Sequence, residues 1–146
     1  MTKISVETRI EAPAQVVWAT LTDFASYPDW NPFLRKFVGD LAVGSKVEVV
    51  TQPDGSKPTT HHSTIVELEP GKSFGWVGHI LVRGIFDVHH HFELRQDGGA
   101  TVLEQSESFE GLLVPVLKGT LAGVERGFRK MNELVKQRAE AGNRPA

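Results

Sequence analysis

The chain has 146 residues, which is enough for one domain with a core of its own. Its net charge of −2, with no basic cluster, gives no electrostatic reason to expect nucleic acid or an anionic membrane surface as a partner. It has no cysteine, which excludes disulfides and thiolate chemistry and fits a reducing compartment. There is no apolar run after Met1 and no stretch long enough to cross a bilayer, so we expect a cytoplasmic protein.

The first elements predicted are a strand and two short helices. Apolar and polar residues alternate over residues 3–11, which is typical of a strand with one face in solvent. At Pro13 the period changes to that of a helix, which we expect to end at Leu21 or Thr22. Residues 23–33 combine two prolines with four aromatic residues, and this pattern predicts a short helix or turn that anchors aromatic rings.

Six further strands follow in the prediction, because short apolar segments alternate with turns that contain glycine or proline. We place these strands at residues 33–39, 46–52, 59–69, 73–80, 84–94 and 100–110. Short connections between successive strands predict an antiparallel meander.

The last predicted element is a long amphipathic helix from residue 111 to about residue 140. Within it, Gly119, Gly123 and Gly127 repeat at every fourth position. Each glycine costs roughly 1 kcal/mol relative to alanine inside a helix, so we expect something to approach this part of the backbone closely. Two interpretations remain open, namely tight packing on the sheet and room left for a ligand.

Several segments together resemble a known superfamily. They lie at residues 10–13 with 16–18, 27–33, 68–72 and 107–113. Through them nearly the whole chain resembles the START-related (SRPBCC, Bet v 1-like) superfamily, which includes polyketide cyclases and dehydrases. The resemblance implies an α+β helix-grip fold, in which a strongly curved seven-stranded antiparallel sheet wraps around the long C-terminal helix, with two short helices between strands 1 and 2 and a cavity between sheet and helix. We expect residues 1–141 to form this single domain and residues 142–146 to be a flexible tail.

Alternation indicates which histidines face the interior. In the strand before the last, the apolar residues and His90 share one row, so we expect His90 inside and both His89 and His91 in solvent. His89 and His91 share a face and could bind a metal with Asp87 or Glu93. We expect them to be solvated surface residues and predict no metal site.

His90 is expected to meet other polar groups. If Asp97 and Gly98 form a two-residue hairpin turn, His90 lies opposite Gln105, with Glu107 next on the same face. These three groups could satisfy one another in the core, anchor the polar end of a ligand, or act in acid–base chemistry. In the third of the six strands, Val66 and Leu68 mark the inward phase. That phase adds His62, Thr60 and Thr64 to the same side.

We expect a protein that binds a small hydrophobic molecule, such as a lipid, a polyketide-like compound or an isoprenoid, as a carrier or sensor without a cofactor. The residues expected to form the site are Trp30, Phe33, Val49, His62, Val66, Trp76, Phe86, Val88, His90, Gln105, Glu107, Val124 and Phe128.

Two alternatives remain. One is a cyclase/dehydrase-type enzyme in which His90 removes a proton α to a carbonyl and Glu107 orients the imidazole. The other is a module that binds a peptide or client helix, which would require an open groove. The hydrolase, P-loop and paired-cysteine motifs are missing from the sequence. A monomer and a homodimer are both compatible with it.

Overall fold

The computed structural model describes residues 2–80 and 84–143. The chain begins with β1 (Thr2–Ile10), α1 (Ala14–Leu21), the 3-10 turn η1 (Phe24–Ser26) and α2 (Tyr27–Trp30). Six strands follow, namely β2 (Leu34–Val38), β3 (Lys46–Thr51), β4 (Thr59–Glu69), β5 (Ser73–Ile80), β6 (Phe86–Asp97) and β7 (Ala100–Glu110). The chain then passes through the 3-10 turn η2 (Val114–Leu117) into α3 (Lys118–Gly142).

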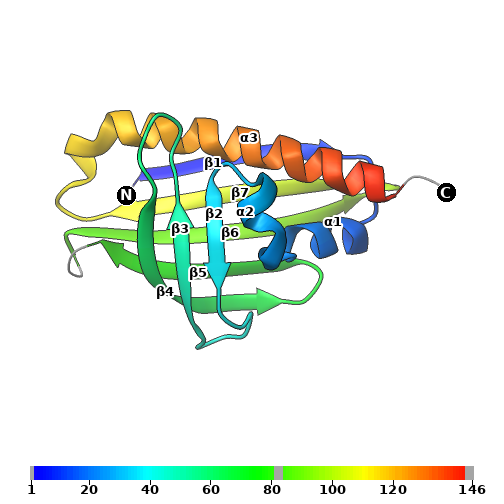
Figure 1. Ribbon diagram of the computed structural model, residues 1–146, viewed down its shortest axis with the longest axis horizontal. Helices are drawn as coiled ribbons and strands as arrows, with labels where there is room; N and C mark the ends of the chain where they lie inside the picture. The colour runs from blue at the N-terminus through cyan, green and yellow to red at the C-terminus, as the bar shows by residue number, and fades with distance from the viewer. Residues whose placement is uncertain (1, 81–83, 144–146) are drawn as a thin grey trace.

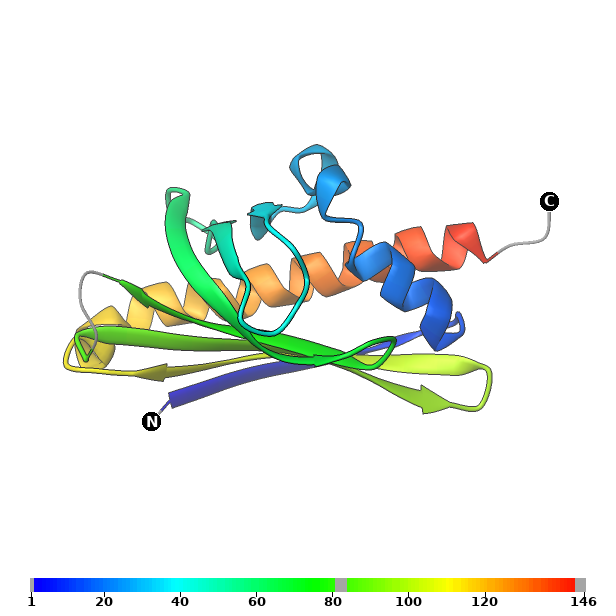
Figure 2. The ribbon, with the colours of Figure 1, turned by 90° about the horizontal axis from the view of Figure 1, so that it is seen from below.

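All seven strands form one antiparallel sheet in the order β1-β7-β6-β5-β4-β3-β2. Strands that follow one another pair along the meander, and β1 completes the sheet by pairing with β7. The sheet curls around α3, and its β2–β4 part rises on the side where the helix lies (Figures 1 and 2). The predicted helix-grip fold, with its two short helices between β1 and β2, is therefore confirmed.

The segment between α1 and β2 fixes aromatic rings in the core, as its composition predicted. Tyr27 is fully buried, and its hydroxyl donates a hydrogen bond to the carbonyl of Leu21. The Asn31 side-chain oxygen accepts hydrogen bonds from the backbone N–H groups of Phe33 and Leu34, at 3.0 and 2.8 Å. These bonds fix the start of β2 and hold the Phe33 ring under α3.

The prediction that the last helix begins at residue 111 is wrong. Gly111 has a positive φ of 124°, and a Cβ atom there would lie 2.4 Å from the carbonyl oxygen of Ile85. The backbone N–H of Leu113 donates to the same carbonyl at 3.0 Å. Residues 111–113 are thus held against the turn before β6, and regular helix begins only at Lys118.

The C-terminal end also differs from the prediction. Gly142, expected in the tail, is the last residue of α3, and Asn143 caps the helix. Residues 144–146 of the predicted tail lie outside the described residues, as does Arg83 of a predicted turn. No helix in the described parts of the chain is long and apolar enough to cross a membrane.

The glycine row of α3 lies against the turn between β3 and β4. A Cβ atom on Gly123 would lie 2.5 Å from the carbonyl oxygen of Asp54, and one on Gly127 would lie 2.7 Å from the Phe33 ring. Gly119 faces open space. The close approach is therefore confirmed at two of the three glycines, and packing against the turn and Phe33 explains it.

Asp54 ties this turn to α3. Its backbone N–H donates to the Gly123 carbonyl at 2.9 Å, and its carboxylate accepts from Arg126 and Lys130 at 3.0 and 2.7 Å. Lys130 and Arg126 hold the pKa of the Asp54 carboxyl below its usual value.

We expect Gly123→Ala to destabilise the protein by about 1–3 kcal/mol, because the new methyl group would overlap the carbonyl oxygen of Asp54, a residue held against the helix by its backbone N–H and its carboxylate. Gly119→Ala is the matched control and should be neutral or stabilising by up to about 1 kcal/mol. Urea denaturation of both variants measures the difference. Equal stability of the two variants would contradict the packing explanation.

Candidate functional site

A chain of buried polar side chains crosses the interior beside α3. His90 Nδ1 lies 2.5 Å from Glu107 Oε2, and His90 Nε2 lies 2.9 Å from Gln105 Oε1. Gln105 Nε2 donates to Asn132 Oδ1 at 2.8 Å, and Asn132 Nδ2 donates to the carbonyl of Val6 at 3.3 Å. The chain links β6, β7, α3 and β1, and all four of its side chains are buried.

The Val6 carbonyl determines where the protons lie along this row of hydrogen-bonded side chains, because a carbonyl can only accept a hydrogen bond. Asn132 must turn its NH₂ group to that carbonyl and its oxygen to Gln105. Gln105 then presents its own oxygen to His90, so His90 Nε2 must carry a proton. One further proton lies between His90 Nδ1 and Glu107 Oε2, as an imidazolium–carboxylate pair or as an imidazole with a carboxylic acid.

Aromatic rings enclose the imidazole of His90. Trp76 lies directly opposite it on β5 and stacks on it, with ring centroids 4.5 Å apart and an interplanar angle of 3°. Phe33, Phe92 and Phe128 contact the same ring from other sides. His90 is fully buried, so it is the member of the pair that a ligand cannot touch.

A cavity of about 80 Å³ lies between the sheet and the first half of α3. Its walls are formed by Phe33, Thr51, Pro53, Thr59, His61, Phe86, Val88, Glu107, Phe109, Thr120, Leu121 and Val124. Thr59 and Thr120 are exposed and mark its mouth, beside the turn that Asp54 ties to α3. The space is a small cavity, and a peptide or client helix would need an open groove.

Glu107 presents one oxygen of the polar chain to this cavity. Its Oε2 is bonded to His90, and its Oε1 has no hydrogen-bond partner among the described residues. His90 and Gln105 lie behind Glu107 and are not part of the wall. The enzyme alternative assigns proton removal to His90, whereas Glu107 is the member of the pair that lines the cavity.

The predicted inward face of β4 is wrong. His62 and Thr60 are exposed, whereas His61 is buried and lines the cavity. The cause is a β-bulge, because Ile65 pairs with Trp76 and Glu67 pairs with Gly75, the residue before Trp76, which leaves Val66 unpaired. Val66 is 43% exposed.

The bulge reverses the alternation of the earlier part of β4. Leu68, which lies after it, packs on the core as predicted, but the residues before it point the opposite way. Thr64 is only partly buried, and its hydroxyl accepts a hydrogen bond from Lys46. The apolar side chain of Ile65 was the signal in the sequence that indicated the correct inward face for this part of β4. Val66 and Leu68 indicated the opposite face.

His61 is the titratable residue of the cavity wall that sequence reasoning missed, and the predicted site also lacked Thr51, Pro53, Thr59, Phe109, Thr120 and Leu121. Its Nε2 lies 2.9 Å from the hydroxyl oxygen of Thr51, and its Nδ1 is buried without a hydrogen-bond partner. Burial lowers the pKa of His61, the charge of Glu107 opposes this shift, and His90 adds to it. His61 is therefore a neutral imidazole at pH 7, and one of its nitrogens is unpaired.

Comparison with known families places the chain. The family described as polyketide cyclase / dehydrase and lipid transport matches residues 1–140. The chain belongs to this family.

Solved structures share the fold of this polyketide cyclase/dehydrase family chain at low sequence identity. The Zhui aromatase/cyclase of a Streptomyces species is 19% identical, with a TM-score of 0.79 over 98% of this chain and 96% of that one. A norcoclaurine synthase of Thalictrum flavum is 13% identical, with a TM-score of 0.73 over 98% and 96%. Ara h 8.0201 is 13% identical, with a TM-score of 0.71 over 96% and 98%. A comparison with curated protein sequences gave no match.

The predicted register between β6 and β7 is shifted by two residues in this family member. Asp97 pairs with Ala100, so the hairpin turn is made by Gly98 and Gly99, and His90 lies opposite Glu107. Because side chains alternate with a period of two, an even shift leaves every residue on its predicted face. The expected grouping of His90 with Glu107 therefore survives the error.

The other residues expected at the site lie in three different places. Phe33, Phe86, Val88, Glu107 and Val124 line the cavity. Val49, Trp76 and Phe128 are buried in the core outside the cavity wall. Trp30 lies elsewhere, under the guanidinium of Arg138 at 4.9 Å from the ring centroid.

The histidines expected in solvent do lie on the outer face of the sheet. His89 is exposed, and His91 is partly buried with Nδ1 2.7 Å from Glu67 Oε1. The ligand atoms of His91, Glu93 and Glu104 lie within 4.8 Å of one another. This outer cluster is separated from the cavity by the sheet itself.

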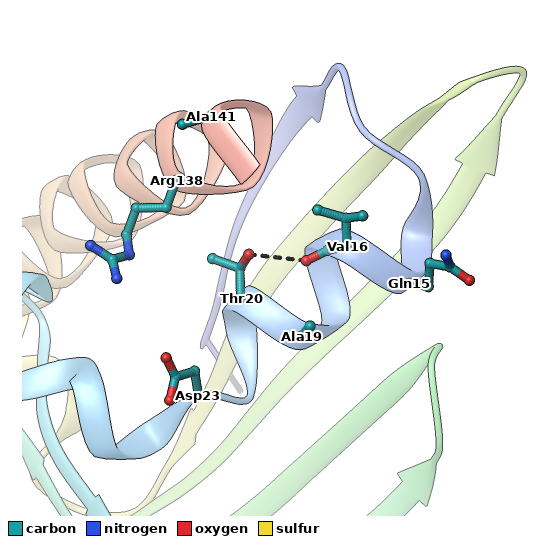
Figure 3. Close-up of a pocket in the computed structure, with 7 residues that line it drawn as sticks. All are labelled: Gln15, Val16, Ala19, Thr20, Asp23, Arg138 and Ala141. Carbon is teal, nitrogen blue, oxygen red and sulfur yellow. Dashed lines mark hydrogen bonds between the residues drawn. The ribbon is translucent and has the colours of Figure 1, made fainter. Parts of the chain in front are cut away.

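A larger groove of about 610 Å³ lies between α1 and the end of α3. Figure 3 shows its lining, with Asp23 and Arg138 facing each other from different elements and the Thr20 hydroxyl bonded to the Val16 carbonyl. None of the seven described residues that line it is buried. Buried polar groups converge at the cavity, so we place the candidate site there.

The unpaired imidazole predicts a pH dependence of stability. Above about pH 6.5, the ordinary pKa of histidine, His61 is neutral in both the folded and the unfolded chain. Below it, the unfolded chain binds a proton that folded His61 resists, so stability should fall by at most about 1.4 kcal/mol per pH unit until the lower folded pKa is passed. Urea denaturation between pH 7 and pH 5 should show a smaller loss for His61→Gln than for the wild type. An identical pH profile for both would contradict this assignment.

Proposed function

We propose that this chain binds a small hydrophobic molecule that carries a hydrogen-bond donor, in the cavity between the sheet and α3. The observation that carries the proposal is the position of Glu107, a residue that is only 7% exposed and lies at the wall of an otherwise largely apolar cavity. Apolar walls with a few convergent polar groups are the usual arrangement of a small-molecule site.

The hydrogen bonds of Glu107 specify the polarity of the ligand. In either form of the pair, the shared proton lies on the line between Oε2 and His90 Nδ1. Oε1 is then an acceptor in both forms, so the ligand should offer it a donor, such as an alcohol, phenol or enol hydroxyl. A carbonyl alone would face an acceptor and is disfavoured.

The size of the cavity limits what it can hold as it stands. Its volume of about 80 Å³ is about half that of an engineered cavity of about 150 Å³ that binds benzene. A ligand with an aromatic ring or longer chain therefore requires the mouth to widen. The contact between the Asp54 turn and α3 is the part of the wall that would move. The family description, with its lipid and polyketide chemistry, supports an aliphatic or aromatic body for the ligand.

A second candidate function, proton transfer to and from a carbon acid, is favoured by the shared proton of the pair. In the imidazolium–carboxylate form, Glu107 Oε1 would take a proton α to a ligand carbonyl, and the electron pair would move onto the carbonyl oxygen. His90 would then act as a positioning residue that holds the Glu107 carboxylate in place and compensates its negative charge. Carrier and enzyme thus use the same cavity and differ in whether the proton moves.

Phenol and toluene, which have nearly the same size, test the donor requirement. We expect phenol to bind the wild type about tenfold more tightly in a ¹H–¹⁵N NMR titration, because only phenol can donate to Glu107. Glu107→Gln should keep this preference, since the amide N–H can donate to His90 Nδ1 and leave an oxygen for the ligand. Glu107→Leu should abolish it.

The position of bound phenol is an independent control. Intermolecular NOEs to the methyl groups of Val88 and Val124 are expected from the cavity. NOEs to Val16 and Ala19 would instead place phenol in the groove of Figure 3. That result, or a phenol preference that survives in Glu107→Leu, would overturn the proposal.

The same variants separate the carrier from the enzyme. If Glu107 exchanges carbon-bound protons, the wild type in D₂O should deuterate phenylacetone at its α carbons, and Glu107→Gln should lose this activity while it still binds phenol. No exchange by the wild type above the buffer rate would eliminate the enzyme candidate and leave the carrier.

A further inference from the structure

We infer that the ligand carries a second polar group, uncharged, which hydrogen-bonds to Nδ1 of His61. This inference rests on the proposed function, because it assigns a second contact in the same cavity. It narrows the ligand class to small hydrophobic molecules with two oxygen functions, such as dihydroxyaromatic compounds or hydroxyketones.

The first reason is the unpaired nitrogen itself. His61 is 9% exposed and lines the cavity, and its Nδ1 has no partner among the described residues. A buried polar atom left unpaired costs about 1–3 kcal/mol, which a ligand group in the right place would recover. Most buried polar atoms in native proteins are paired, so an unpaired one at a cavity wall points to a missing partner.

The second reason is the hydrogen bond on the other side of the ring. The Thr51 hydroxyl can either donate to His61 Nε2 or accept from it, so both neutral tautomers keep this bond. Nδ1 can therefore act as an acceptor for a hydroxyl or as a donor to a carbonyl. Burial also lowers the pKa of His61, which favours a neutral imidazole and thus an uncharged partner.

The third reason is the separation of the two polar groups. Glu107 lies on β7 and His61 lies on β4, with β6 and β5 between them in the sheet. The sheet curls around α3 (Figure 2), and both residues line one small cavity. A ligand that satisfies both atoms must make two hydrogen bonds, one to Glu107 Oε1 and one to His61 Nδ1.

Ser63 provides a matched control on the same strand. Its hydroxyl is also buried and unpaired, and it is the next inward residue of β4 after His61. It is not part of the cavity wall. Removing its hydroxyl should therefore leave ligand binding unchanged.

The test compares phenol with the 1,2-, 1,3- and 1,4-isomers of dihydroxybenzene by NMR titration of the wild type, His61→Gln, His61→Asn and Ser63→Ala. At least one isomer should bind the wild type about fivefold or more tightly than phenol. His61→Gln keeps a polar group near the Nε2 position only and should lose this advantage. His61→Asn, which places one near Nδ1, should recover part of it, and Ser63→Ala should retain it.

A measurement without any variant keeps the test decisive if His61→Gln fails to fold. The ¹⁵N resonance of His61 Nδ1 should shift when the preferred dihydroxybenzene binds to the wild type, and should shift little with phenol. The inference is overturned if no isomer gains over phenol, if the gain survives in His61→Gln, or if Nδ1 does not respond. Phenol binding through Glu107 with no gain for any isomer would defeat this inference alone, whereas no binding of any probe would defeat the proposed function as well.

Discussion

The hydrogen bond from Asn132 to the Val6 carbonyl is the constraint on which the interior depends. A backbone carbonyl cannot donate, so it orients the amide of Asn132, then that of Gln105, and finally the imidazole of His90. The last member, Glu107, is left with one oxygen engaged and one facing the cavity. A contact between the first strand and the last helix thus determines which atoms a ligand meets.

The same arrangement joins the parts of the fold that form the cavity. Asn132 links α3 to β1 near the middle of the helix, and Asp54 links it to the β3–β4 turn nearer its beginning. The first half of α3 covers a cavity of about 80 Å³ through Thr120, Leu121 and Val124, and aromatic rings pack around His90 behind its wall. The protein therefore has a buried polar network on one side of the cavity and surface contacts of the Asp54 turn beside its entrance. These contacts include exposed ion pairs that contribute little individually.

Periodicity in the sequence predicted the strands and helices and part of the candidate site, while the helix-grip arrangement of these elements was implied by the resemblance to the START-related superfamily. The period-two pattern placed His90 inside, and the face stayed correct although the hairpin turn was shifted. The pattern failed at Val66, because a bulge inserts a residue without any strong sequence signal, and this failure hid His61. The start of α3 was missed because the hydrogen bonds from Leu112 to the Gly84 carbonyl and from Leu113 to the Ile85 carbonyl are long-range contacts, which local propensity does not contain. The direction of each proton required the three-dimensional chain of partners.

The protonation of His90 tests this account most directly. A long-range ¹H–¹⁵N NMR spectrum at pH 7 should show a proton on Nε2, with Nδ1 either carrying the shared proton or accepting it from Glu107. A neutral imidazole with its proton on Nδ1 and a bare Nε2 would contradict the account. It would require Gln105 and Asn132 to turn over and place an Asn132 oxygen against the Val6 carbonyl.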